Sequence, residues 1–127
     1  MLLLDTHVLL WVLAGSERLG DRARERIQGP ETVYVSAATT WELAIKSMLG
    51  KLSLPENILE RITDQGIALL AVTAEDGLAI RRFPEIARHD PFDRLLVAQA
   101  ATAGMPLMTA DRTLLTLGRR YILDATQ

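Results

Sequence analysis

The sequence contains no cysteine and only two histidines among its 127 residues. Without cysteine the chain can form neither a disulfide framework nor a thiolate metal site. This composition fits a protein of the reducing cytoplasm. The scarcity of histidine also argues against zinc, because zinc in proteins is held mainly by thiolate and imidazole ligands.

Long hydrophobic runs are also missing. The N-terminal stretch MLLLDTHVLLWVLAG is largely apolar, but Asp5 and His7 interrupt it and no basic segment precedes it. Its longest uninterrupted piece, Val8 to Ala14, is far shorter than the roughly 20 residues that a membrane helix needs. We therefore expect a soluble, cytoplasmic protein without a membrane segment.

The chain has no excess of positive charge, since its formal net charge is −2 and its pI is about 5.6. Nucleic-acid binders are often basic because phosphates attract Lys and Arg. The net charge therefore argues against broad, non-specific binding to nucleic acid. It is compatible with a nucleic-acid enzyme, because acids gathered around a metal ion would lower the pI by themselves.

Repeats, low-complexity tracts and linkers are absent, and 49% of the residues are hydrophobic and 24% charged. This mixture and length predict one compact globular domain over residues 1–127.

Apolar runs and turn residues predict alternating strands and helices. Strands are expected at 2–4, 33–36, 67–72, 107–109 and 121–123. Helices are expected at 7–14, 20–28, 39–49, 55 to about 66, 73 to about 83 and 91–103, with a short one before the last strand. Such alternation favours a mostly parallel sheet covered on both faces, a three-layer α/β/α fold.

Four acids lie where this fold would bring them together. Asp5 ends the first strand, Asp111 follows the 107–109 strand, Asp93 is in the first turn of the long helix, and Glu42 is early in the helix after the second strand. In parallel sheets these points share one edge, where ligands bind. Carboxylates meeting there would repel one another unless a cation lay between them.

A hard divalent cation, Mg²⁺ or Mn²⁺, is the natural partner of such a cluster, because these ions prefer oxygen ligands. The expected chemistry is hydrolysis of phosphodiester bonds by a metal-activated water.

The sequence resembles the PIN-domain nucleases, in particular the VapC-type toxins of bacterial toxin–antitoxin pairs. Four segments in the family's order and spacing carry the resemblance: LLLDTH, SAATTWELAIK, HDPFDRLLVAQA and LMTADRTL. The resemblance implies a single PIN domain and an Mg²⁺- or Mn²⁺-dependent endoribonuclease. Its acidic quartet corresponds here to Asp5, Glu42, Asp93 and Asp111. It also implies a VapB-type antitoxin partner, an RNA substrate such as tRNA or mRNA, and a homodimer.

Each acid also has a structural interpretation. Asp5, Asp93 and Asp111 stand where acids cap a helix or interact with its dipole. Glu42 could pair with Lys46 one turn later. Asp90, before Pro91, is interpreted as the cap of the long helix rather than as a ligand. We prefer direct metal ligation for Asp5 and Asp93. For Glu42 we expect a role as a ligand or as support for a ligand, and for Asp111 a metal-binding or water-positioning role.

Several cations near the proposed site could contact RNA phosphates. Lys46 and Arg94 are the preferred candidates, while Arg81, Arg82 and Arg88 are more typical of a solvated surface.

The remaining polar and aromatic residues have simpler expectations. Thr6, Thr109 and Ser36 stand at strand ends, where the two threonines could hold carboxylates. His7 and His89 could act in proton transfer, but a metal-activated water does not require an imidazole, so we expect them on the surface or in the core. Trp11, Trp41 and the stripe at 58, 59 and 62 are expected in the core, with part of the early apolar helices available to an antitoxin.

Two other functions stay open. A different metal-dependent phosphoesterase is disfavoured, because His7 stands where a haloacid-dehalogenase-type phosphatase has its second Asp and no glycine-rich phosphate loop is found. A non-catalytic PIN-fold binding module is disfavoured by the intact set of acids.

Overall fold

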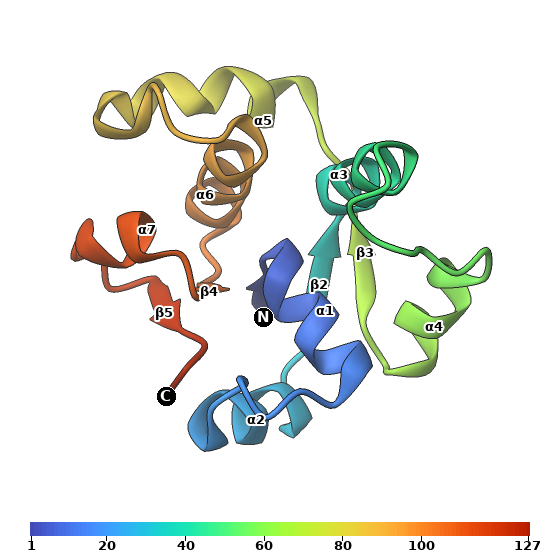
Figure 1. Ribbon diagram of the computed structural model, residues 1–127. Coiled ribbons are helices and arrows are strands. Elements are labelled where there is room, and N and C mark those ends of the chain that lie inside the picture. Colours follow the sequence, from blue (N-terminus) through green and yellow to red (C-terminus); the bar gives the residue numbers. More distant parts are fainter.

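A computed structural model describes residues 1–127 as a five-stranded parallel sheet with helices on both faces (Figure 1). The strands are β1 (Leu2–Leu4), β2 (Val33–Ser36), β3 (Ala68–Leu70), β4 (Leu107–Thr109) and β5 (Ile122–Asp124). The helices are α1 (Thr6–Ala14), α2 (Asp21–Gln28), α3 (Ala37–Met48), α4 (Ile58–Asp64), α5 (Ala74–Ala79), α6 (Pro91–Ala103) and α7 (Arg112–Thr116), with the 3₁₀ helices η1 (Ile80–Arg82) and η2 (Pro84–Ile86). The predicted three-layer α/β fold is confirmed.

The strand order, β3-β2-β1-β4-β5, places β1 at the centre of the sheet. The chain builds outward from β1 to β3 and then returns to place β4 on the other side of β1, with all pairs parallel. The direction of winding therefore changes between β1 and β4. In open α/β sheets this change leaves a crevice beyond the carboxyl ends of the two strands, where ligands bind.

Alternating residues of the central strand fill two separate cores. Leu2 and Leu4 pack with α1, α2 and α3 on one face of the sheet. Leu3 packs with α6 and α7 on the other face. Because both faces of β1 are covered, all three leucines are fully buried, which explains the uninterrupted apolar run in the sequence.

Helix α6 is fixed at both ends by local sequence signals. Asp90 Oδ1 accepts hydrogen bonds from the backbone N–H groups of Phe92 and Asp93, and Pro91 occupies the first turn. Gly104 ends the helix with a φ of 65°, a conformation that glycine adopts without strain. The predicted cap role of Asp90 is confirmed. Although α6 is the longest helix, with 13 residues, neither it nor any other helix is long and apolar enough to cross a membrane.

Two core predictions are wrong. Trp41 is 63% exposed and Leu59 is 50% exposed. Trp41 lies on the exposed side of α3, and its ring forms a T-shaped contact with that of Phe92, with centroids 5.2 Å apart. Helix α4 buries Ile62 fully but turns Leu59 toward solvent.

Element boundaries also differ from the predictions. Helix α3 begins directly after β2, because Ser36 Oγ accepts from the N–H of Ala38 and caps it. Strand β3 is confined to residues 68–70, and the helix predicted to reach Phe83 ends at Ala79 and continues as η1.

Replacing Leu3 with Ala is expected to lower the free energy of unfolding by about 2–5 kcal/mol, because a buried leucine on the central strand leaves a cavity. Leu69→Ala on the edge strand β3 is the matched control, since Leu69 is 45% exposed, and we expect a loss of about 0.5 kcal/mol. Urea denaturation measures both. Equal losses would contradict the assignment of β1 as the structural centre.

Candidate functional site

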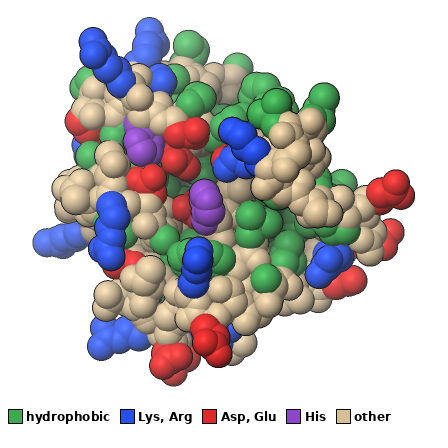
Figure 2. All heavy atoms as spheres, viewed as in Figure 1, with side chains coloured by type: hydrophobic (Ala, Val, Ile, Leu, Met, Phe, Trp, Pro, Cys, Tyr) green, Lys and Arg blue, Asp and Glu red, His purple; other side chains and the backbone are tan.

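A cavity of about 330 Å³ opens beyond the carboxyl ends of β1 and β4, at the switch in winding direction. Its walls are mostly charged: Asp5, His7, Trp11, Glu42, Lys46, Asp90, Asp93, Ala110 and Asp111. Acidic side chains gather around this hollow, with histidine and Lys or Arg side chains near them (Figure 2). All four predicted acids are therefore brought together.

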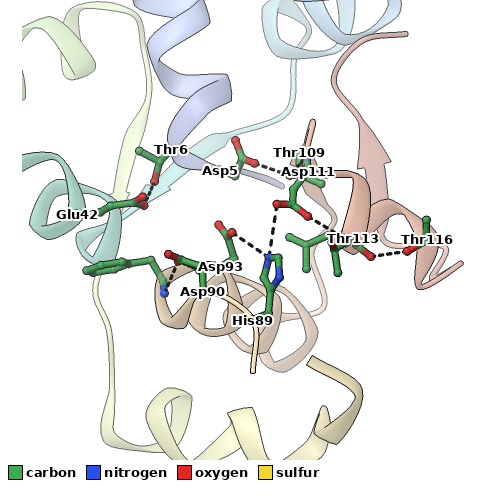
Figure 3. A network of polar contacts seen from close by, with 12 residues as sticks. Asp5, Thr6, Glu42, His89, Asp90, Asp93, Thr109, Asp111, Thr113 and Thr116 are labelled. Carbon is green, nitrogen blue, oxygen red and sulfur yellow. Dashed lines mark hydrogen bonds and ion pairs between the residues drawn. The ribbon is translucent and has the colours of Figure 1, made fainter. Parts of the chain in front are cut away.

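Asp5 and Asp111 reach the cavity because each caps a helix. Asp5 Oδ1 accepts from the N–H of Val8 at 2.8 Å, and Asp111 Oδ1 accepts from the N–H of Leu114 at 3.0 Å. Thr109 links them, because its hydroxyl donates to Asp5 Oδ2 and accepts from the N–H of Asp111 (Figure 3). Capping and placement in the site are thus compatible, since each carboxylate has two oxygens.

Glu42 is held from two sides. Its Oε1 accepts from the Thr6 hydroxyl at 2.6 Å, and its Oε2 forms an ion pair with Lys46 Nζ at 2.8 Å. The Thr6 and Thr39 hydroxyls are in turn 3.1 Å apart. Glu42 is only 5% exposed, so its orientation is set by these contacts rather than by solvent. Lys46 extends from α3 to the cavity wall and remains about one-third exposed.

His89 lies in the site, and its expected place on the surface or in the core is wrong. Its Nε2 is 3.2 Å from Asp93 Oδ2 and 3.5 Å from Asp111 Oδ2 (Figure 3). The i, i+4 spacing of His89 and Asp93 across the Asp90 cap was the sequence signal for this contact. The approach of Asp111 had no local signal, since Asp111 belongs to a different strand–helix connection.

The arginines predicted near the site do not line the cavity. Arg94 is half-buried on α6 beside Asp93 but is not among the residues that line the cavity. Arg81 and Arg82 line a separate cavity by α5, and Arg88 is exposed.

Burial, helped by neighbouring acids, raises the pKa of two carboxyl groups. Burial, followed by the charges of Asp90, Asp5, Asp111 and Glu42, raises the pKa of Asp93 to about 7. Burial also raises the pKa of Asp5, although hydrogen bonds from Thr109 and Val8 oppose the change. Both shifts mean that the charged form of each carboxyl is disfavoured at its buried position, and for Asp93 the neighbouring carboxylates add to this effect.

The donor set fits a divalent cation. It consists of carboxylate oxygens and one imidazole nitrogen, and donor atoms of His89, Asp93 and Asp111 all lie within 4.8 Å of one another. A cation among them would relieve the repulsion that raises the pKa of Asp93.

The sequence also matches the profile of the PIN domain, over residues 2–119. The chain belongs to the PIN domain family. A curated relative, Ribonuclease VapC22 of Mycobacterium tuberculosis, is 29% identical over 114 residues, which cover 88% of each chain.

Solved structures share the fold at low sequence identity. One is a DNA-bound VapBC from Salmonella typhimurium (20% identity, 97% of this chain and 96% of that one, TM-score 0.69). Another is VapBC2 from Rickettsia felis bound to a promoter DNA fragment (11% identity, 97% and 96%, TM-score 0.66). At these identities the likeness establishes the PIN fold, with its parallel sheet and flanking helices.

Asp93→Asn is expected to stabilise the protein in the presence of a chelator, increasingly so as the pH rises. The folded-state pKa of Asp93, about 7, lies above its ordinary value of 3.8, so the folded protein holds this proton more tightly and loses stability as the pH rises between those values. The Asn side chain does not ionise, so the variant does not lose stability in this way. Urea denaturation at about pH 5 and about pH 8 measures the difference.

Asp64→Asn, at the exposed end of α4, is the control for removing one negative charge. A stability gain for Asp93→Asn that does not grow with pH would contradict the assigned electrostatic crowding.

Proposed function

We propose that this PIN-domain protein is a metal-dependent endoribonuclease and the toxin of a toxin–antitoxin pair. The convergence of Asp5, Glu42, Asp93 and Asp111 on one cavity is the observation that carries the proposal. The likeness to a relative named as a ribonuclease supports the choice of RNA as substrate. All the proposed site residues lie within a single PIN domain over residues 1–127.

The four acids are the proposed ligands of Mg²⁺ or Mn²⁺. When bound, such an ion supplies the positive charge that activates water and stabilises a phosphodiester as negative charge develops on it. The chain's own residues fix the carboxylates beforehand. The Val8 and Leu114 N–H groups orient Asp5 and Asp111, and the Thr6 hydroxyl orients Glu42.

Lys46 and Arg94 are the proposed RNA contacts. Lys46 reaches the cavity wall, where its ammonium lies 2.8 Å from Glu42, close to where a scissile phosphate would bind. Arg94 follows Asp93 on α6 and would contact a phosphate outside the cavity. These cations would compensate locally for the overall negative charge of the chain.

The proposed antitoxin site is a cavity of about 200 Å³ between α1 and α4, lined in part by Leu10, Leu13, Leu54 and Ile58. The toxin–antitoxin complexes among the structural neighbours support a protein partner.

A second exposed apolar surface on α3, formed by Trp41, Met48 and Leu49, is proposed for a homodimer.

Asp5→Asn and Asp93→Asn are each expected to lower the rate of RNA cleavage in Mg²⁺ or Mn²⁺ at least about 100-fold, because each removes a proposed metal ligand. EDTA should abolish cleavage by the wild type. Gel analysis of a short RNA measures the rate, and circular dichroism checks the fold.

Asp64→Asn, far from the cavity, should cleave at the wild-type rate. Full cleavage by either site variant would contradict the proposed nuclease mechanism. Absence of Mn²⁺ binding and of cleavage by the wild type would instead favour a non-catalytic PIN-fold module.

Lys46→Gln is expected to weaken RNA binding and to reduce the salt dependence of the affinity by about 0.7 in logarithmic slope, the value for one phosphate contact on a single strand. Fluorescence anisotropy in the non-cleaving Asp93→Asn background measures this. Lys51→Gln, at an exposed position outside the cavity, is the control. An unchanged slope for Lys46→Gln would remove Lys46 from the proposed RNA contacts.

A further inference from the structure

His89 is a nitrogen donor within the acid cluster, and the proposed function gives it no role. Its backbone N–H donates to Ile86 O at 3.0 Å, and the next residue, Asp90, caps α6. The side chain therefore leaves the chain just before the first turn of the helix. It is 18% exposed and points at Asp93 and Asp111 rather than at solvent (Figure 3).

The spacing of the three donors fits adjacent positions around one ion. Neighbouring ligands of an octahedral ion with bonds of 2.0–2.1 Å are about 3 Å apart, and opposite ligands are about 4 Å apart. His89 Nε2 is 3.2 Å from Asp93 Oδ2 and 3.5 Å from Asp111 Oδ2. The donor atoms of His89, Asp93 and Asp111 all lie within 4.8 Å of one another, so one cation can lie among them.

We propose that His89 Nε2 is a direct ligand of the divalent cation, beside Asp93 and Asp111, and that it makes the site prefer Mn²⁺ to Mg²⁺. This inference rests on the proposed metal dependence of the site. Mn²⁺, although it also binds oxygen ligands, accepts an imidazole nitrogen more readily than Mg²⁺, which gives up its waters reluctantly. A nitrogen in the ligand set therefore shifts selectivity toward manganese.

The second histidine supplies a matched control. His7 lines the same cavity, from the first turn of α1, but its side chain is exposed and makes no hydrogen bond or ion pair with the acids. These are the only two histidines in the chain. A nitrogen signal from histidine must therefore come from one of two known positions.

Pulsed electron paramagnetic resonance of the full chain loaded with one equivalent of Mn²⁺ tests the proposal, because it detects a nitrogen nucleus bound directly to manganese. We expect an imidazole coupling in the wild type and in His7→Asn, and its loss in His89→Asn. Isotopically labelled histidine in the His7→Asn protein should alter the coupling, which assigns it to His89 even if His89→Asn does not fold.

Calorimetric titration supplies a second readout. His89→Asn is expected to weaken Mn²⁺ binding about 10-fold or more and Mg²⁺ binding much less, so that the preference for Mn²⁺ falls. Equal weakening of both ions would overturn the predicted selectivity.

The outcomes separate this inference from the proposed function. Bound Mn²⁺ without an imidazole coupling, or with a coupling that only His7→Asn removes, overturns the role of His89 and leaves the metal-dependent nuclease standing. A wild-type protein that binds neither ion overturns both.

Discussion

Repulsion among carboxylates at the carboxyl edge of the sheet is the constraint on which the arrangement of this protein depends. Four separate elements each deliver one acid to the same cavity, and burial adds to the cost of charging them. Backbone N–H groups, threonine hydroxyls, Lys46 and His89 each offset part of that cost. Burial and then the neighbouring carboxylates raise the pKa of Asp93, and a cation at this position would favour its charged form.

The same contacts that place the acids also build the fold. Asp5 starts α1 and Asp111 starts α7, each with one oxygen, while the other oxygen contacts Thr109 or His89. From sequence, capping and metal ligation looked like competing explanations of these residues. The geometry shows that a cap at the carboxyl end of a parallel strand also faces the crevice, so capping and placement in the cavity occur together.

Much of the fold and of the acid cluster could be predicted because the signals are local. Buried strands appear in the sequence as apolar runs. Asp90, Pro91 and Gly104 mark the ends of α6. Parallel strands then bring their ends to one edge whatever the details of packing. The sequence did not predict that Trp41 and Leu59 are exposed. Each lies on a helix with a wide apolar face, and the sequence does not show which part of such a face another element covers. His89 was missed because its contact with Asp111 depends on how α6 packs against the β4–α7 connection.

The hydrogen bond between Thr109 and Asp5 joins residues 104 positions apart in the chain. Loop closure over such a distance costs conformational entropy, which the contacts at this end of the sheet must offset. During synthesis, the first acid leaves the ribosome long before its partners on β4 and α7 exist. A nascent chain therefore has an incomplete cavity until β4 and the start of α7 have been synthesised.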